Sequence, residues 1–388
     1  MKVLMISWEY PPKKVGGLAT HVQHLSDELA ALGVEVQVLS CSFPGKPERQ
    51  TLRKGLVIHR VDVYDFPSPD FLSWAMSMNH SLLEYGSRLT GREHFDVIHA
   101  HEWMILPCAF CMKSLSGSPL VYSIHSTEYG RRNGLPSDFS RTIHECEGWG
   151  SYEASKIVVC SNYMRDHVRW LFNTPDQKIA TIPNGVVENP VRSAPIEFRR
   201  AFADDNERII LFVGRLVHEK GLGVLIGAIP NLLKDGTRVK LMVIGDGYAA
   251  DEMKKLAWDL GIYDKVYFRG YVTDEELHKA FKIADVLSVP SLFEPFGIVT
   301  LEGMVSGTPV VVSDVGGLSE IVRHEVNGLK VRPNDSLELA SSLKRILVED
   351  QLRRTLVQNA LEDVAVRYSW RSIAKATLHI YEQLASGR

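Results

Sequence analysis

A regular alternation of short apolar runs with amphipathic segments constrains this fold more than any other feature. The apolar runs predict strands at residues 3–7, 36–40, 97–100, 120–124, 157–160, 209–213, 240–244, 266–268, 286–289 and 310–313. Helical periodicity runs through residues 20–32, 222–233 and 274–283. Strands and helices that alternate in this way build βαβ units and parallel sheets. The sequence therefore predicts an α/β fold of doubly wound sheets.

The predicted strands are too many for one ordinary open sheet. With 388 residues the chain is long enough for two domains. A break rich in Pro, Asn and charge falls near residues 184–206. We expect a Rossmann-like domain at 1–188, a second at 189–369 and a helix at 370–388 that crosses back to the first. Ligands of such sheets bind beyond the carboxyl ends of the strands, so we expect site residues there, facing a cleft between the domains.

Composition excludes several classes of protein. Apolar residues make up 45% and charged residues 23%, which is typical of a globular protein. The net charge of -3 gives no basic excess of the kind that nucleic-acid binders carry. No apolar run reaches the roughly 18 residues that span a bilayer, and the N-terminus resembles a strand rather than a signal peptide. Five cysteines do not make a disulfide framework in a chain of this length. We expect a cytoplasmic protein, with peripheral membrane contact and oligomeric state left open.

Two glutamates eight residues apart, Glu294 and Glu302, flank a predicted junction between a loop and a helix. If residues 296–306 are helical and Gly307 ends the helix, Glu294 lies at its mouth and Glu302 lies about two turns inside. Backbone N–H groups at a helix N-terminus point toward a bound anion. Carboxylates beside such groups suit a ligand that carries both hydroxyls and negative charge, such as a nucleotide sugar.

Two cations follow the strand at 209–213. Arg215 comes directly after the strand and Lys220 stands just before the next helix. At the ligand end of a sheet, such a pair neutralises a diphosphate and stabilises it as a leaving group. The alternative is two ordinary surface cations on a loop. No two aspartates are spaced i, i+2, so the chain lacks the acidic pair that holds a divalent metal on a diphosphate. The side-chain cations are therefore predicted to replace the metal.

The predicted first domain offers its own strand-end residues. Lys14, Gly16 and Gly17 follow the first strand and precede a helix. Paired glycines allow close approach of the backbone to a ligand, although an ordinary βα turn explains them as well. His125 follows the strand at 120–124, where either a ligand contact or a simple strand-end hydrogen bond accounts for it.

The segment around residues 96–103 also ends a strand. His99 and His101 share one strand face, but a zinc site would need a third ligand. We favour a packing role for His99 and a position in the ligand cleft for Glu102 or Trp103. No metal site is predicted.

Two further motifs are weak. Cys108 and Cys111 lie on one helix face, and no second CxxC completes a zinc site. Gly245 to Ala250 matches a dinucleotide fingerprint, but Arg269 stands where an NAD site has an acidic residue. A tight turn is the better interpretation of this second motif.

Together these residues resemble the retaining glycosyltransferases of the GT-B fold, in the group that includes glycogen and starch synthases. The resemblance covers nearly the whole chain, and the spacing of the two glutamates downstream of the Arg/Lys pair is its most specific part. The matching motifs are Glu9-Tyr-Pro-Pro12, Gly16-Gly17, residues 96–103, Gly214-Arg215, Lys220-Gly221, Glu294 to Glu302 and Gly316-Gly317.

The resemblance implies a role for each donor-side residue. Arg215 and Lys220 would bind and activate the donor diphosphate, Glu294 would contact the sugar hydroxyls, and Glu302 would hold the ribose. The backbone N–H groups implied to reach the sugar or phosphates are those of Phe296, Gly297 and Ile298.

The resemblance also assigns the first domain. His125 would lie against the donor sugar, where its carbonyl steadies positive charge at the anomeric carbon, and Gly16 and Gly17 would approach the diphosphate and the acceptor. The residues implied on the acceptor side are Lys14, Glu102 and Trp103.

The implied activity is transfer of a hexosyl unit, with glucose from UDP or ADP favoured, and with retention of configuration by front-face attack. It implies no metal and no cofactor. Lys14 to Gly17 fits the K-x-G-G pattern of glycogen and starch synthases, whereas Glu102 stands where that subgroup often has Asp. An α-glucan acceptor is therefore favoured, with small-molecule, sugar-phosphate and lipid acceptors as alternatives. A nucleotide-sugar epimerase and a non-catalytic accessory subunit remain as alternatives of other classes.

Overall fold

The computed structural model describes residues 1–64 and 68–387. Residues 65–67 and Arg388, the last residue of the predicted C-terminal helix, lie outside this description. Contacts divide the chain into two compact units. The first is Met1–Gly185 together with the C-terminal segment that begins at Trp370, and the second is Val186–Ser369. The predicted boundary after residue 188 lies slightly beyond the observed one.

The first unit is built on a sheet of eight strands among the described residues, in the order β3-β4-β2-β1-β5-β6-β7-β8. The strands are β1 (Lys2–Ile6), β2 (Glu35–Cys41), β3 (Arg49–Arg53), β4 (Leu56–Val61), β5 (Val97–His101), β6 (Leu120–Ile124), β7 (Lys156–Val159) and β8 (Ile179–Thr181). Neighbouring strands are parallel except β3 and β4. The strand order reverses between β1 and β5, which is where doubly wound sheets bind their ligands.

The central strands of this sheet are almost continuously buried. β5 and β6 are buried along their whole length, as expected where helices cover both faces. On α1, residues Val22, Leu25 and Leu29 recur at helical spacing and enter the core. The helices of the first unit are α1 (Gly17–Ala31), α2 (Phe71–Thr90), α3 (Leu106–Ser116), α4 (Glu128–Arg132), α5 (Asp138–Glu153), α6 (Asn162–Phe172) and the C-terminal α15 (Trp370–Ser386).

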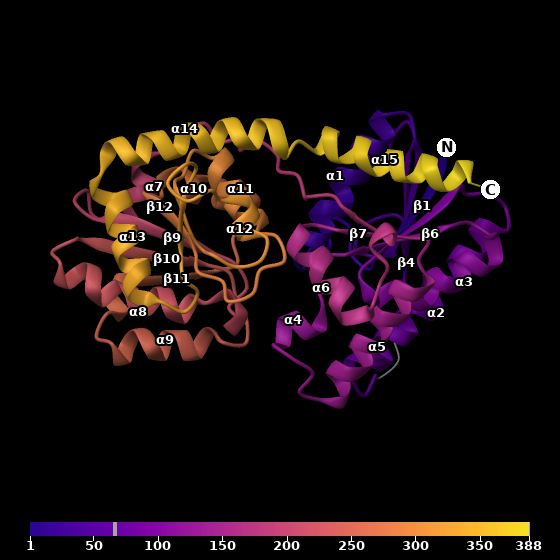
Figure 1. Ribbon diagram of the computed structural model, residues 1–388, viewed down its shortest axis with the longest axis horizontal. Helices are drawn as coiled ribbons and strands as arrows, with labels where there is room; N and C mark the ends of the chain where they lie inside the picture. The colour runs from indigo at the N-terminus through magenta and orange to yellow at the C-terminus, as the bar shows by residue number, and fades with distance from the viewer. Residues whose placement is uncertain (65–67, 388) are drawn as a thin grey trace. The chain divides into compact units, whose positions relative to one another are not determined.

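Helix α15 returns to the first unit and packs beside α1 (Figure 1). At its start, the Trp370 ring fills the space next to Gly185, where an added Cβ would lie 2.6 Å from a ring carbon. Further along, the hydroxyl of buried Tyr381 lies 2.6 Å from His99 Nδ1 on β5. The predicted return of this helix is therefore confirmed.

The second unit holds six parallel strands among the described residues, in the order β11-β10-β9-β12-β13-β14. They are β9 (Arg208–Val213), β10 (Val239–Ile244), β11 (Val266–Gly270), β12 (Val286–Val289), β13 (Val310–Ser313) and β14 (Leu329–Val331). The strand order reverses between β9 and β12. The helices are α7 (Ile196–Arg200), α8 (Leu222–Lys234), α9 (Ala250–Asp259), α10 (Asp274–Ile283), α11 (Ile298–Val305), α12 (Leu318–Ile321), α13 (Ser336–Val348) and α14 (Asp350–Arg367).

The α/β prediction of two doubly wound units is confirmed, with a few differences in detail. The sequence did not predict β3, β8 or β14, because β3 is largely exposed and polar and both β8 and β14 span only three residues. It also missed β4, although this strand is mostly apolar and buried. The helix expected over 296–306 begins at Ile298 and ends at Val305. Among the described residues, no helix combines the length and apolar character needed to cross a bilayer.

Candidate functional site

In the second unit, the structure brings Lys220 and Glu294 together. Lys220 ends the short helix η3 (His218–Lys220) after β9, and Glu294 lies on the loop after β12. Lys220 Nζ donates to Glu294 Oε2 at 2.7 Å, and Ser291 Oγ donates to the same oxygen at 3.2 Å. Since β9 and β12 are neighbours at the point where strand order reverses, this ion pair lies where such a sheet binds a ligand.

Glycine is required where the two loops meet. Gly221 has φ 68, and a Cβ there would lie 2.0 Å from the Pro290 carbonyl oxygen. The turn after Lys220 is therefore pressed against the loop that carries Glu294. This contact fixes the spacing of the ion pair.

Arg215 is more exposed than Lys220. Its guanidinium lies 3.5 Å from Glu219 Oε1, and about half of its side chain is exposed. The turn after β10 packs closely against the segment after β9. A Cβ at Gly247 would lie 2.4 Å from the Leu216 carbonyl oxygen. The fingerprint-like motif at Gly245 thus serves as a tight turn.

The mouth of α11 has a constrained backbone. Gly297 precedes the helix with φ 109, and a Cβ there would lie 2.5 Å from the Leu318 side chain. Gly317 N donates to the Glu294 carbonyl at 2.9 Å, and a Cβ on Gly317 would lie 2.4 Å from Phe296 Cα. The glycines of the two loops therefore position Glu294 beside the first turn of α11, whose N–H groups have no partner inside the helix.

Three other predicted donor residues take different places on this loop and helix. Phe296 is buried, with its ring 6.1 Å from that of Tyr368, so only its backbone is suited to a ligand. Ile298 is the first residue of α11, and half-buried Glu302 lies within the helix.

In the first unit, Glu9 organises the loop that leads into α1. The carboxylate is 2% exposed and its Oε2 accepts a hydrogen bond from Val15 N at 2.6 Å. Burial raises the pKa of Glu9 to about 7, against backbone hydrogen bonds from Val15, Gly16 and Ala19 that lower it. Beyond its place in a motif, sequence reasoning gave Glu9 no role. The available signal was an acidic residue three positions after the buried strand β1.

Gly16, on the same loop, has open space around it. It caps α1 with an extended backbone, and a Cβ there would meet no atom within 4 Å. Glycine is therefore needed at this position neither for its backbone angles nor for the packing of the chain. Gly16, Gly17 and Lys14 are all exposed.

Glu102 links the ends of β5 and β6. Its Oε1 accepts from His125 N at 3.0 Å and from Ser126 N at 3.1 Å, and its backbone has φ 69. Burial raises its pKa, and Arg131 opposes that shift. Trp103, predicted in the ligand cleft, is buried and packs edge-on against the exposed Phe71.

A carboxylate cluster that the sequence did not reveal surrounds Arg131. Arg131 Nη2 lies 3.1 Å from Glu128 Oε2 and 3.4 Å from Glu147 Oε1. Glu147 is fully buried and its pKa is raised to about 8 by burial. No periodic pattern marks these residues, because the cluster forms only when α4 and α5 pack together.

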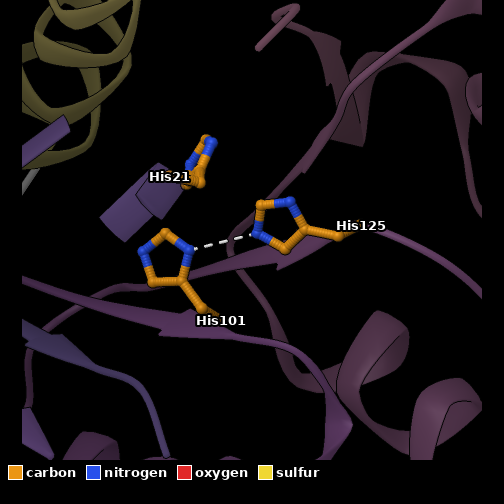
Figure 2. Close-up of side chains that lie close together, drawn as sticks. All are labelled: His21, His101 and His125. Atoms are coloured by element: carbon orange, nitrogen blue, oxygen red, sulfur yellow. Dashed lines mark hydrogen bonds between the residues drawn. The ribbon is translucent and has the colours of Figure 1, made fainter. Parts of the chain in front are cut away.

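Three histidines from separate elements meet at the strand ends of the first unit (Figure 2). His21 comes from α1, His101 ends β5 and His125 follows β6. His101 Nδ1 lies 3.3 Å from His125 Nε2, and His21 Nδ1 donates to Asn184 Oδ1 at 2.7 Å. Burial lowers the pKa of His21 to about 4 and holds those of His101 and His125 well below their usual value, so all three rings are neutral near pH 7.

His99 differs from these three. Its Nδ1 lies 2.6 Å from the Tyr381 hydroxyl and its Nε2 lies 2.7 Å from Ser123 Oγ, so both nitrogens are engaged within the core. A packing role accounts for it. The sequence placed His99 and His101 on one strand face, and their ring centroids lie 4.1 Å apart. The fold adds His21 and His125 beside His101.

Two family models match the chain. The model described as Glycosyltransferase Family 4 covers residues 15–189, and the one described as Glycosyl transferases group 1 covers residues 194–363. An uncharacterized glycosyltransferase of Methanocaldococcus jannaschii is 41% identical, with 98% of each chain covered. A glycogen synthase of Mycobacterium tuberculosis is 33% identical over 98% of this chain and 94% of its own length.

The solved structure of a sucrose-phosphate synthase from Thermosynechococcus elongatus superimposes with a TM-score of 0.85, at 25% identity and with 100% of each chain covered. Fold and relatives together define a glycosyltransferase of the GT-B fold. The chain belongs to the group 1 glycosyl transferases and is similar to the glycogen and starch synthases among them.

Proposed function

We propose that this enzyme transfers a hexosyl unit from a nucleoside-diphosphate sugar to an acceptor hydroxyl, with retention of anomeric configuration. The observation that carries the proposal is the Lys220–Glu294 ion pair at the mouth of α11. In this pair, a cation that can bind phosphate lies beside a carboxylate that can bind hydroxyls. The free backbone N–H groups of the first turn of α11 are nearby and can bind an anion.

In the donor complex, Lys220 and Arg215 bind the diphosphate and stabilise the charge that develops on it. An ammonium has three N–H donors, so Lys220 can keep its hydrogen bond to Glu294 and still donate to phosphate oxygens. Glu294 then orients the sugar through its hydroxyls. The N–H groups of Gly297 and Ile298 bind sugar or phosphate oxygens, and Glu302 holds the ribose.

The bond between the anomeric carbon and the diphosphate oxygen breaks as the acceptor oxygen attacks from the same face. The acceptor proton moves to the departing diphosphate, so no protein carboxylate has to form a covalent intermediate. The cationic charge of Lys220 and Arg215 makes a metal on the diphosphate unnecessary, and we propose that transfer requires neither metal nor cofactor.

The first unit supplies the remaining groups in this proposal. His125 contacts the transferred sugar, and its backbone is held by the Glu102 carboxylate. Gly16 and Gly17 give the diphosphate and acceptor close access to the backbone, and Lys14 lies on the acceptor side.

For the donor and acceptor, we propose glucose carried by UDP or ADP, and an α-glucan. The support is the similarity to a glycogen synthase at 33% identity and the Lys14 to Gly17 motif. Small-molecule, sugar-phosphate and lipid acceptors are the alternatives that the same donor site allows, since pocket contacts rather than fold decide the acceptor. We place the enzyme in the cytoplasm, with carbohydrate rather than nucleic acid as its partner.

The test is a screen of UDP-, ADP- and GDP-glucose against maltose-type acceptors, with and without EDTA. The proposal expects donor consumption that depends on an acceptor and resists EDTA. It fails if no donor is transferred or slowly hydrolysed and Lys220→Ala changes nothing. Conversion of the sugar nucleotide to an epimer without any acceptor would instead favour an epimerase.

A further inference from the structure

We propose that His21, His101 and His125 form a binding site for one divalent transition-metal ion of the zinc type (Figure 2). Each offers one ring nitrogen, and these nitrogens lie within 4.8 Å of one another. Among the residues that the structure describes, this is the one group of three or more metal-binding side chains found.

The spacing of two of these nitrogens suits tetrahedral coordination. With metal–nitrogen bonds of about 2.0–2.1 Å, two ligands of a tetrahedral zinc ion lie about 3.3 Å apart. His101 Nδ1 and His125 Nε2 are 3.3 Å apart. One ring nitrogen of His21 lies within 4.8 Å of a ring nitrogen of each of the other two histidines, so a shift of about 1.5 Å would bring it to a third corner of the tetrahedron.

Asn184 and Trp370 fix the tautomer and the orientation of the His21 ring. Asn184 Oδ1 can only accept, so the proton of the ring sits on Nδ1 and the lone pair on Nε2. An oxygen acceptor behind a ligating histidine is the usual support that fixes its tautomer. The Trp370 ring packs edge-on against His21 at 5.3 Å and holds the imidazole in place.

Two of the three rings, those of His21 and His101, are buried, and His125 is half-buried. His101 is fully buried, and its Nε2 has no hydrogen-bond partner among the described residues. Coordination through Nδ1 would replace the contact of this nitrogen with His125 Nε2 by a bond from both rings to the same ion. Half-buried His125 gives an ion access to the cluster, and the fourth position is left for water.

The donor set selects the metal. Three neutral imidazoles suit zinc, copper, nickel or cobalt, whereas magnesium and calcium require oxygen ligands. The neighbouring His99 cannot serve as a ligand, because Tyr381 and Ser123 engage both of its nitrogens.

One consequence rests on the proposed function. An ion at this site would hold the side chain of His125, the residue that we assign to the transferred sugar. The metal would therefore slow transfer rather than support it. Metal binding itself does not depend on that assignment.

The experiment uses the full chain, stripped with EDTA, and titrates it with Co²⁺ and Zn²⁺. The expected result is one Zn²⁺ bound per chain and the visible absorption of tetrahedral Co²⁺. His125→Ala should abolish both, and Asn184→Ala should weaken Zn²⁺ binding by about 10–100-fold while all three ligands remain. His94→Gln, at an exposed histidine of the same unit, should leave binding unchanged.

Circular dichroism checks that each variant is folded, and half-buried His125 tolerates replacement better than the two buried rings. The proposal is overturned if the wild-type chain binds Zn²⁺ no more tightly than His125→Ala does. A separate assay measures glucosyl transfer with and without Zn²⁺. Metal binding without any transferase activity would support the metal site and overturn the proposed function. EDTA-resistant transfer without metal binding would overturn the metal site and support the proposed function.

Discussion

Lys220 Nζ and Glu294 Oε2 lie 2.7 Å apart on loops that follow the adjacent strands β9 and β12. A cation and a carboxylate are thus fixed side by side before any donor binds. Both side chains are largely buried, so neither reorganises freely. This preorganisation is what a site needs to stabilise a departing diphosphate.

Lys220→Ala should lower kcat/KM by roughly 100- to 1000-fold, the size of effect seen when one preorganised charge-stabilising donor is removed. Lys254→Ala is the matched control, because it also breaks a lysine–carboxylate pair, the exposed one with Asp251 on α9. Steady-state kinetics on both variants is the measurement. Equal losses in the two would contradict the assigned role.

Gly16→Ala should leave stability within about 0.5 kcal/mol of wild type, because the added Cβ meets nothing and the backbone is extended. Activity should nevertheless fall, because the methyl group occupies space meant for a ligand. Gly221→Ala, by contrast, should destabilise the fold by roughly 1–3 kcal/mol through its clash with Pro290. Thermal unfolding and kinetics on the pair check this contrast, and an unaltered Gly16→Ala enzyme would count against it.

Glu102→Ala should reduce kcat by about 10- to 100-fold, since two backbone hydrogen bonds that hold His125 and Ser126 are lost. Glu102→Gln keeps a carbonyl acceptor and should restore most of the rate. A residue that only supports the fold would not show this rescue. Comparison of kcat and KM for the two variants, with unfolding curves as a control, is the required measurement.

Glu9 should make stability depend on pH. Its pKa is raised from 4.5 to about 7, so the folded state binds the proton more tightly than the unfolded state does. The stabilisation is complete below about pH 4.5 and is lost as the pH rises through about 7. Across that window, the stability difference between wild type and Glu9→Gln should change by roughly 3 kcal/mol in favour of the variant. Urea unfolding at several pH values measures it, and a constant difference would refute the prediction.

The sequence indicated the side-chain contacts of the second unit's donor site better than those of the first unit. Lys220 and Glu294 both follow apolar strands, and strand ends in parallel sheets converge, so their proximity could be inferred. The place of His21 could not, because its distance from His101 depends on how α1 packs against the sheet. The carboxylates around Arg131 were missed for the same reason, since helix–helix packing leaves no local pattern.

Trp103 shows what a strand-end position does not predict. Its position predicted a place in the ligand cleft, but the chain turns at Glu102 and the indole on η1 (Trp103–Ile105) is buried, so its contact with a ligand stays a prediction. A strand-end position therefore indicates nearness to the site but not the direction of the side chain. Side-chain direction is set by the backbone angles of the turn, here φ 69 at Glu102.

The anomeric configuration of the product tests the central claim most directly. The purified enzyme is incubated with UDP- or ADP-glucose and a maltose-type acceptor in EDTA, and the new linkage is assigned by nuclear magnetic resonance. We predict an α linkage that forms without metal, is lost with Lys220→Ala and persists with Lys254→Ala. A β linkage, or a product that forms equally well without Lys220, would contradict the account.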